Sequence, residues 1–128
     1  MRFILLVLLA GAVAIAPLSS HHSFAAHYFE EESTTITGDV VEFEYRSPHA
    51  WVHVMASDEA GTMRRYAAEW ANPNRLAQQG ITKDTLQPGD RVVVIGSPGR
   101  TPSEYKIHLK GIDRPADGWK WRPARNRR

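Results

Sequence analysis

The sequence of 128 residues contains no cysteine. This absence excludes a disulfide framework, a zinc–thiolate site, a thiol nucleophile and a cysteine-linked lipid anchor. A glycine-rich phosphate-binding loop is also missing, because residues 96–99 are typical of a turn and do not open a helix. Any metal ion must therefore be held by nitrogen and oxygen ligands. This points to the six histidines, all of which lie beyond residue 20.

The apolar residues are unevenly spread, and 15 of them lie in residues 1–20. Residues 3–16 are a continuous small or apolar run after Met1-Arg2, and Pro17 follows it. As a helix this run spans about 21 Å, too short for a hydrocarbon core of about 30 Å. These features predict a secretory signal peptide at residues 1–20, and hence a periplasmic or secreted protein. Cleavage after Ser20 makes His21 the mature N-terminus, and cleavage after Ala14 is the alternative.

The rest of the chain has the pattern of a small β protein. β-Branched and aromatic residues gather in segments bounded by turn residues, and Gly38 predicts a bulge or bend in the first segment. Asn72-Pro73 is a helix-start signal and Gly80 a stop, which predicts a short helix after the third segment. The fold class is therefore predicted as mainly β, a five-stranded OB-like barrel or a meander in a single domain at residues 21–113. The expected strands are residues 34–45, 50–56, 62–70, 91–96 and 104–112.

The net charge of +2 conceals two regions of opposite sign. Residues 114–128 carry a net charge of +5, and residues 21–113 carry −4. We expect residues 114–128 to form a flexible basic tail, because chain ends are usually frayed and solvated. The tryptophans and basic residues of this tail are of a kind that contacts an anionic membrane surface.

A mature chain that begins with His21 has a specific metal chemistry. The α-amine and Nδ1 of an N-terminal histidine chelate one ion, and a third nitrogen from another histidine completes a T-shaped site. Amine and imidazole nitrogens suit Cu(II), so copper is the expected metal. His49 is the predicted third ligand, because it lies beside the turn at Ser47-Pro48, and His22 and Glu69 are predicted as helpers.

The other histidines carry weaker expectations. His53 shares a strand face with Trp51 and Met55, which is typical of a packed histidine with its hydrogen bonds satisfied. His27 reaches a site only if its segment folds back, and His108 has no identifiable partner. No nucleophile–base–orienter arrangement is visible, so an enzyme is not predicted and no catalytic residue is assigned.

Several of these residues together resemble a known bacterial family, the domain of unknown function 6152. The resemblance covers residues 21–112 and implies a small exported β-barrel protein of unassigned activity. The chain departs from the family pattern at His27, where an acidic residue is usual, and at Ile81, where an aromatic is usual. The residues that carry the resemblance are His21-His22-Ser23-Phe24-Ala25-Ala26, Pro48-His49-Ala50-Trp51, Glu69, Asn72-Pro73, Leu76, Gly80 and Leu86-Gln87-Pro88-Gly89-Asp90.

Two functions follow from these observations. The first is an exported copper carrier or sensor that uses His21 and His49. The second is an exported OB-type module that binds a protein or glycan without a metal, through the second and third strands. Its ligand surface would carry Trp51, Tyr66 and Trp70. Nucleic acid is not expected as a partner of a secreted protein.

Overall fold

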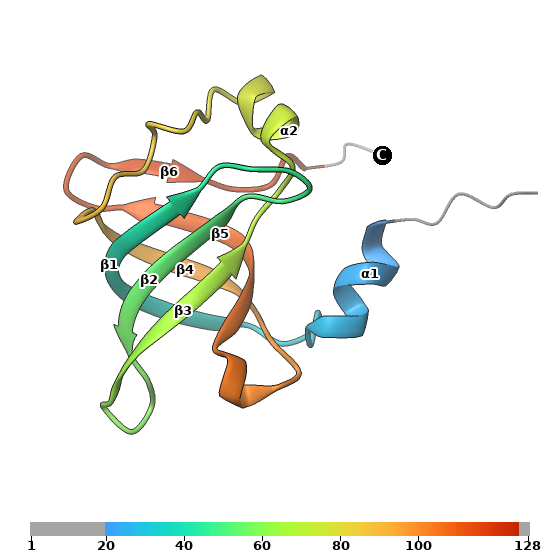
Figure 1. The fold of residues 1–128 in the computed structure, drawn as a ribbon, viewed down its shortest axis with the longest axis vertical. Helices are drawn as coiled ribbons and strands as arrows, with labels where there is room; N and C mark the ends of the chain where they lie inside the picture. The colour runs from blue at the N-terminus through green and yellow to red at the C-terminus, as the bar shows by residue number, and fades with distance from the viewer. Residues whose placement is uncertain (1–19, 126–128) are drawn as a thin grey trace, which may run out of the picture.

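The computed structural model describes residues 20–125, with side chains from residue 23 onward. Most of the predicted leader therefore lies outside the described residues, and so do the side chains of His21 and His22. The described chain contains two helices, six strands and one 3₁₀ turn (Figure 1). In chain order these are α1 (Ser20–His27), β1 (Thr34–Glu44), β2 (Trp51–Ser57), β3 (Met63–Glu69), α2 (Pro73–Gln78), β4 (Arg91–Pro98), η1 (Pro102–Glu104), β5 (Lys106–Arg114) and β6 (Trp119–Trp121).

The strands form one sheet that closes on itself. Their order is β3-β2-β1-β4-β5-β6, and a parallel pairing of β3 with β5 closes the first five strands into a barrel. Full closure removes the exposed sheet edges that would otherwise pair with other chains. The predicted fold class is confirmed: the protein is mainly β, a closed five-stranded OB-like barrel with a short helix between β3 and β4.

Helix α2 begins and ends where the sequence predicts. The side chain of Asn72 accepts a hydrogen bond from the backbone N–H of Asn74, and Pro73 occupies the first turn. Proline costs nothing there, because its missing N–H would have no partner in the helix. Gly80 follows the helix with a φ of +78°, a left-handed conformation that glycine adopts without strain.

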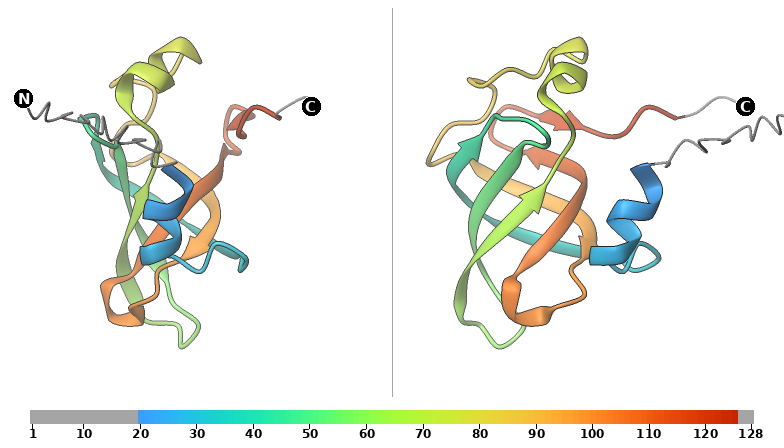
Figure 2. Two further views of the ribbon diagram at one scale, coloured as in Figure 1. Left: turned by 90° about the vertical axis from the view of Figure 1, so that its right-hand side faces the viewer. Right: turned by 45° about the vertical axis from the view of Figure 1, so that its right-hand side comes forward.

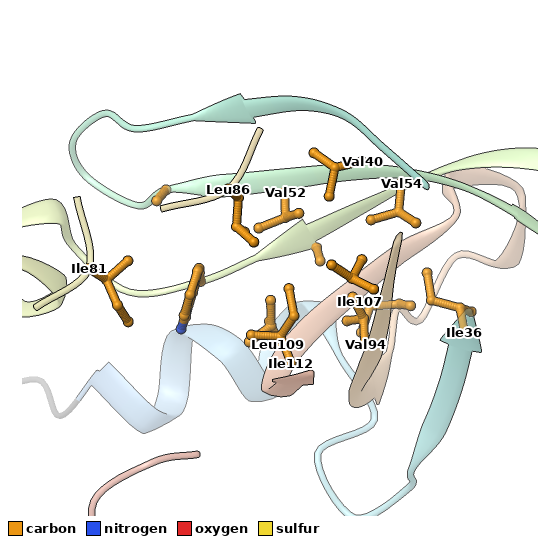
Figure 3. Close-up of a cluster of buried hydrophobic side chains, with 14 of the residues drawn as sticks. Ile36, Val40, Val52, Val54, Ile81, Leu86, Val94, Ile107, Leu109 and Ile112 are labelled. Atoms are coloured by element: carbon orange, nitrogen blue, oxygen red, sulfur yellow. The ribbon is translucent and has the colours of Figure 1, made fainter. Parts of the chain in front are cut away.

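The barrel interior is filled by alternate residues of each strand. In β2, Val52, Val54 and Ala56 are fully buried, while the residues between them are partly exposed. Alternation of this kind follows from the two-residue period of a strand. Figure 3 shows these side chains meeting aliphatic residues of β4 and β5, with Ile81 and Leu86 from the β3–β4 connection closing one end.

The expected flexible tail is wrong for its first part. Residues 119–121 form β6, which pairs with β5 from Ile112 to Arg114. Both tryptophans of β6 pack against the core, and Trp121 lies edge-on to Trp70 with the ring centroids 5.1 Å apart. Trp-Lys-Trp has the two-residue period of a strand with one apolar face, and burial of two indoles outweighs the tendency of a charged terminus to fray.

Helix α1 lies against the outside of the barrel (Figure 2). The chain after it is fixed by backbone hydrogen bonds, from Phe29 N–H to the Pro98 carbonyl and from Arg100 N–H to the His27 carbonyl. Tyr28, the residue directly after the helix, is 1% exposed and forms an isolated β-bridge with Gly99. Within residues 20–125, the helices are too short to cross a membrane.

Candidate histidine–carboxylate site

Four side chains form a row across the outer face of the barrel. Glu44 of β1 pairs with Trp51 of β2, Trp51 pairs with Glu69 of β3, and Glu69 pairs with His108 of β5. The residues that follow or precede them in β2, β3 and β5, such as Val52 and Ala68, are buried in the core. Because side chains alternate along a strand, the row faces outward. Three histidines along this row each contact a glutamate.

The first contact joins His49 to Glu69. His49 lies just before β2, and its Nδ1 is 2.7 Å from Oε2 of Glu69. The other oxygen of Glu69, Oε1, accepts a hydrogen bond of 2.7 Å from the hydroxyl of Tyr28. Burial raises the pKa of Tyr28 far above its ordinary value, and the hydrogen bond and charge of Glu69 raise this pKa further. The phenol therefore stays a donor, and both oxygens of Glu69 are engaged.

This contact favours one tautomer of the neutral His49 ring. A carboxylate that faces Nδ1 favours the proton on that nitrogen and leaves the lone pair on Nε2. In the described part of the chain, Nε2 of His49 has no hydrogen-bond partner. The side chain is 30% exposed, so part of the ring faces solvent.

The second contact joins His108 to Glu30, which follows helix α1. Nδ1 of His108 is 2.7 Å from Oε1 of Glu30, and Lys110 donates a hydrogen bond of 2.9 Å to the Glu30 carbonyl oxygen. The ring of Phe24 in α1 stacks on His108 with centroids 3.8 Å apart and planes 5° apart. The same ring contacts His49 at 5.2 Å and 27°. Helix α1 therefore packs on the imidazole rings of both His49 and His108.

The third contact joins His53 of β2 to Glu44 of β1, and it has the opposite polarity. Here Nε2, and not Nδ1, lies 2.5 Å from Oε1 of the glutamate. The second oxygen of Glu44 pairs with Arg46. The charged neighbours of this pair are Arg46, just after β1, and the ion pair of Glu42 in β1 with Arg65 in β3.

The structure brings together only some of the predicted site residues. His49 and Glu69 are in direct contact, whereas the side chains of His21 and His22 lie outside the described residues. The predicted ligand surface is not a surface. Trp70 is 2% exposed, and Tyr66 is paired with Val54 on the inward face and packs against the core, so only Trp51 faces outward. The two-residue period puts Trp51 and Tyr66 on opposite sides of the sheet.

Sequence reasoning missed Phe24, Tyr28, Glu30 and His108. Phe24 and Tyr28 are four residues apart, a spacing that places two aromatic rings on one side of a helix. That spacing would have indicated that residues 24–28 pack against another part of the chain. His108 and Glu30 are 78 positions apart, and no local pattern joins them.

The fold and these contacts define a class: a small OB-like barrel with a band of histidine–carboxylate pairs on its outer face. The chain belongs to a family of unknown function, DUF6152, whose sequence pattern matches residues 7–107. This match confirms the family indicated by the opening His-His-Ser-Phe and the Pro-His-Ala-Trp segment. No curated protein matches the chain.

A solved structure similar to this chain is that of the mitochondrial single-stranded DNA-binding protein Rim1 from S. cerevisiae. It has a TM-score of 0.46 and 13% sequence identity, and the match covers 64% of this chain and 92% of that one. The name of this neighbour refers to single-stranded DNA, the partner class that the sequence analysis did not expect beside a protein, glycan or membrane contact. At this level of similarity the likeness indicates no ligand for this chain.

Proposed function

We propose that this protein is exported and binds a copper ion through its mature N-terminus and His49. The α-amine and Nδ1 of His21 would form one chelate ring, and Nε2 of His49 would supply the third nitrogen. A chain without cysteine offers no thiolate, and amine and imidazole nitrogens are the ligands that suit Cu(II).

The observation that carries the proposal is the contact between His49 and Glu69. Histidines that bind metals usually donate their other ring N–H to a carboxylate or carbonyl, which orients the ring and raises its basicity. Nδ1 of His49 has this contact at 2.7 Å, and its Nε2 is unpaired among residues 20–125. Both oxygens of Glu69 are engaged, so Glu69 acts as a positioning residue for His49.

The packing of helix α1 against His49 also supports His21 and His49 as ligands of one ion. Phe24 contacts the His49 ring, and positions 21 and 24 are three residues apart. In a helix such positions lie on one side with Cβ atoms about 5–6 Å apart. A mature chain that starts at position 21 would therefore begin close to His49. Position 22 follows at about 100° around the helix axis, which makes His22 the weaker candidate for a ligand.

The proposal is tested on exported protein. Mass spectrometry of the periplasmic form should give His21 as its first residue. Cu(II) titration followed by EPR should then show one ion with nitrogen ligands in this form. Binding should be at least tenfold weaker when one residue is added before His21, because the amine is displaced. Equal affinity of the native and extended forms would contradict the proposal.

Two substitutions separate the roles of the residues. His49→Ala should weaken Cu(II) binding and change the EPR spectrum, whereas His27→Ala is the matched control, because His27 is exposed on the same helix. Glu69→Gln should weaken binding by about 10–100-fold, the usual loss when a partner of a ligating histidine is removed. An unchanged affinity in His49→Ala would remove the third ligand from the proposal.

A further inference from the structure

We propose a second, separate metal site for a divalent ion such as Zn²⁺ on the uncovered part of the outer face. Its ligands are Glu42 and Glu44 of β1 and His53 of β2. We call these three residues the open trio. This inference does not depend on the copper proposal, since it uses none of the same residues.

The donor atoms of the open trio converge. One ligand atom from each residue can be chosen so that all three lie within 4.8 Å of one another. The closest approach is 2.5 Å, between Nε2 of His53 and Oε1 of Glu44. The ligands of a tetrahedral Zn²⁺ lie about 3.4 Å apart when each is about 2.0–2.2 Å from the ion, so Nε2 and Oε1 must separate by about 1 Å to admit it. Among the described residues this is the only group of three such donors.

A β-bulge creates this convergence. The register between β1 and β2 shifts between Val40 and Glu42, where Val40 is opposite Val54 and Glu42 is opposite His53. If Val41 instead paired regularly, opposite His53, the strict two-residue period would turn Glu42 inward, opposite Val52. The bulge instead places Glu42 and Glu44 on the outward side with His53. Bulges commonly re-aim side chains in this way beside functional sites.

The ring orientation of His53 also differs from those of His49 and His108. His49 and His108 present Nδ1 to their glutamates, whereas His53 presents Nε2 to Glu44. In the first arrangement the glutamate orients the imidazole ring. In the open trio a ring nitrogen and one oxygen of each carboxylate lie within 4.8 Å of one another, close enough to gather around one ion.

The charges of the trio match a divalent cation. Two carboxylates and a neutral imidazole carry −2, and three N/O ligands with an open fourth position are typical of zinc. In the absence of an ion, Arg65 pairs with Glu42 and Arg46 pairs with Glu44. Both arginine side chains are more than half exposed, so they can leave toward solvent at little cost when an ion enters.

The test uses the exported chain with one residue added before His21, so that the proposed copper ligand at the N-terminus is blocked. Isothermal titration with Zn²⁺ should show one ion per chain. Glu42→Gln and His53→Gln should each weaken binding at least tenfold. The matched control is Asp39→Asn, because Asp39 lies on the same strand and also pairs with an exposed arginine, Arg91, but has no histidine beside it.

A structural effect of the substitutions is separated from loss of a ligand. Glu42 is exposed, so Glu42→Gln should leave the circular dichroism spectrum and the melting temperature unchanged. In the unsubstituted chain, Zn²⁺ should shift the NMR signals of the His53 ring and leave those of His108 in place. No Zn²⁺ binding, or equal binding by the Glu42→Gln and Asp39→Asn variants, would overturn the site. Neither result bears on Cu(II) binding at His49.

Discussion

His49 and His53 are four residues apart and share one face of the barrel, but the fold gives them different chemistry. His49 lies under helix α1, where Phe24 stacks on its ring and Tyr28 holds its partner Glu69. His53 lies in the open trio, where its neighbours are the exposed ion pairs of Glu44 with Arg46 and of Glu42 with Arg65. Trp51 stands between them in the row.

The difference lies in which ring nitrogen meets the carboxylate. At His49 the carboxylate of Glu69 takes Nδ1, and Nε2 is the nitrogen left for a ligand in the proposed copper site. At His53 the carboxylate of Glu44 takes Nε2, and Glu42 brings a second carboxylate so that one ligand atom of each residue lies within 4.8 Å of the others. Residue type and spacing alone do not distinguish these cases. The helix over His49 and the bulge beside His53 distinguish them, and each can be altered without the other.

The largest expected effect comes from removing the anchor of the covered histidine. Tyr28→Ala deletes a buried aromatic ring and leaves Glu69 without one of its donors. Replacement of a buried aromatic by alanine costs about 3–5 kcal/mol, and the cavity left at the helix adds to the exposure of His49. Denaturant titration should show a loss of this size.

This substitution also separates the two regions. Because Tyr28 does not contact the open trio, Zn²⁺ binding by the folded variant should equal that of the unsubstituted chain. Hydrogen exchange should rise in the segment of α1 and β5 and stay unchanged at the β1–β2 pairing. If hydrogen exchange rose equally in both regions, α1 and the bulge would unfold as one unit, and the two histidine sites would not be independent.

A smaller effect is expected at high pH. Burial raises the pKa of Tyr28 in the folded chain, and the ordinary value of 10.0 applies when the chain is unfolded. The folded state therefore holds a proton that the unfolded state releases above pH 10.0. The contribution of Tyr28 is complete below that pH and is lost as the pH rises beyond it.

Melting curves between neutral pH and pH 11 measure this loss. The unsubstituted chain should lose stability above about pH 10, and Tyr28→Phe should lose less over the same interval, starting from a lower value because its hydrogen bond to Glu69 is gone. The readout is the slope of the melting temperature against pH, and not the absolute melting temperature. Parallel slopes for both proteins would assign the alkaline loss to other tyrosines such as Tyr66, whose pKa burial also raises.

Local patterns were sufficient to predict the barrel. The β2 segment alternates buried and partly exposed residues, and Asn72 and Gly80 bound α2 through contacts within a few residues. Strand β6 was not predicted, because the basic charges of residues 114–128 indicated a frayed terminus and the two-residue spacing of Trp119 and Trp121 was not used. Strand β6 forms because it pairs with β5 and because Trp121 packs on Trp70. These residues meet only in the folded chain, so no local pattern predicts the contact.

The site depends more on long-range contacts. His49 and Glu69 could both be singled out, because one lies beside a turn and the other beside the helix start. Their contact follows from the register of one hairpin, in which Trp51 is opposite Glu69. His108 reaches the row only through the parallel closure of β3 with β5. The bulge at Val41 was also beyond local patterns, since Gly38 was the expected place for one.

The smallest expected effect concerns the guanidinium group that now occupies the open trio. Arg65→Ala removes the partner of Glu42, and both side chains of this pair are 52% exposed. Exposed ion pairs contribute about 0–1 kcal/mol, so the free energy of unfolding should hardly change. The Zn²⁺ affinity should instead increase several-fold, because Glu42 no longer has to release a cation. Arg91→Ala is the matched control: it frees Asp39 on the same strand and should change neither quantity. An increase in Zn²⁺ affinity with Arg91→Ala as large as that with Arg65→Ala would mean that general surface charge, and not the ligands beside His53, attracts the ion.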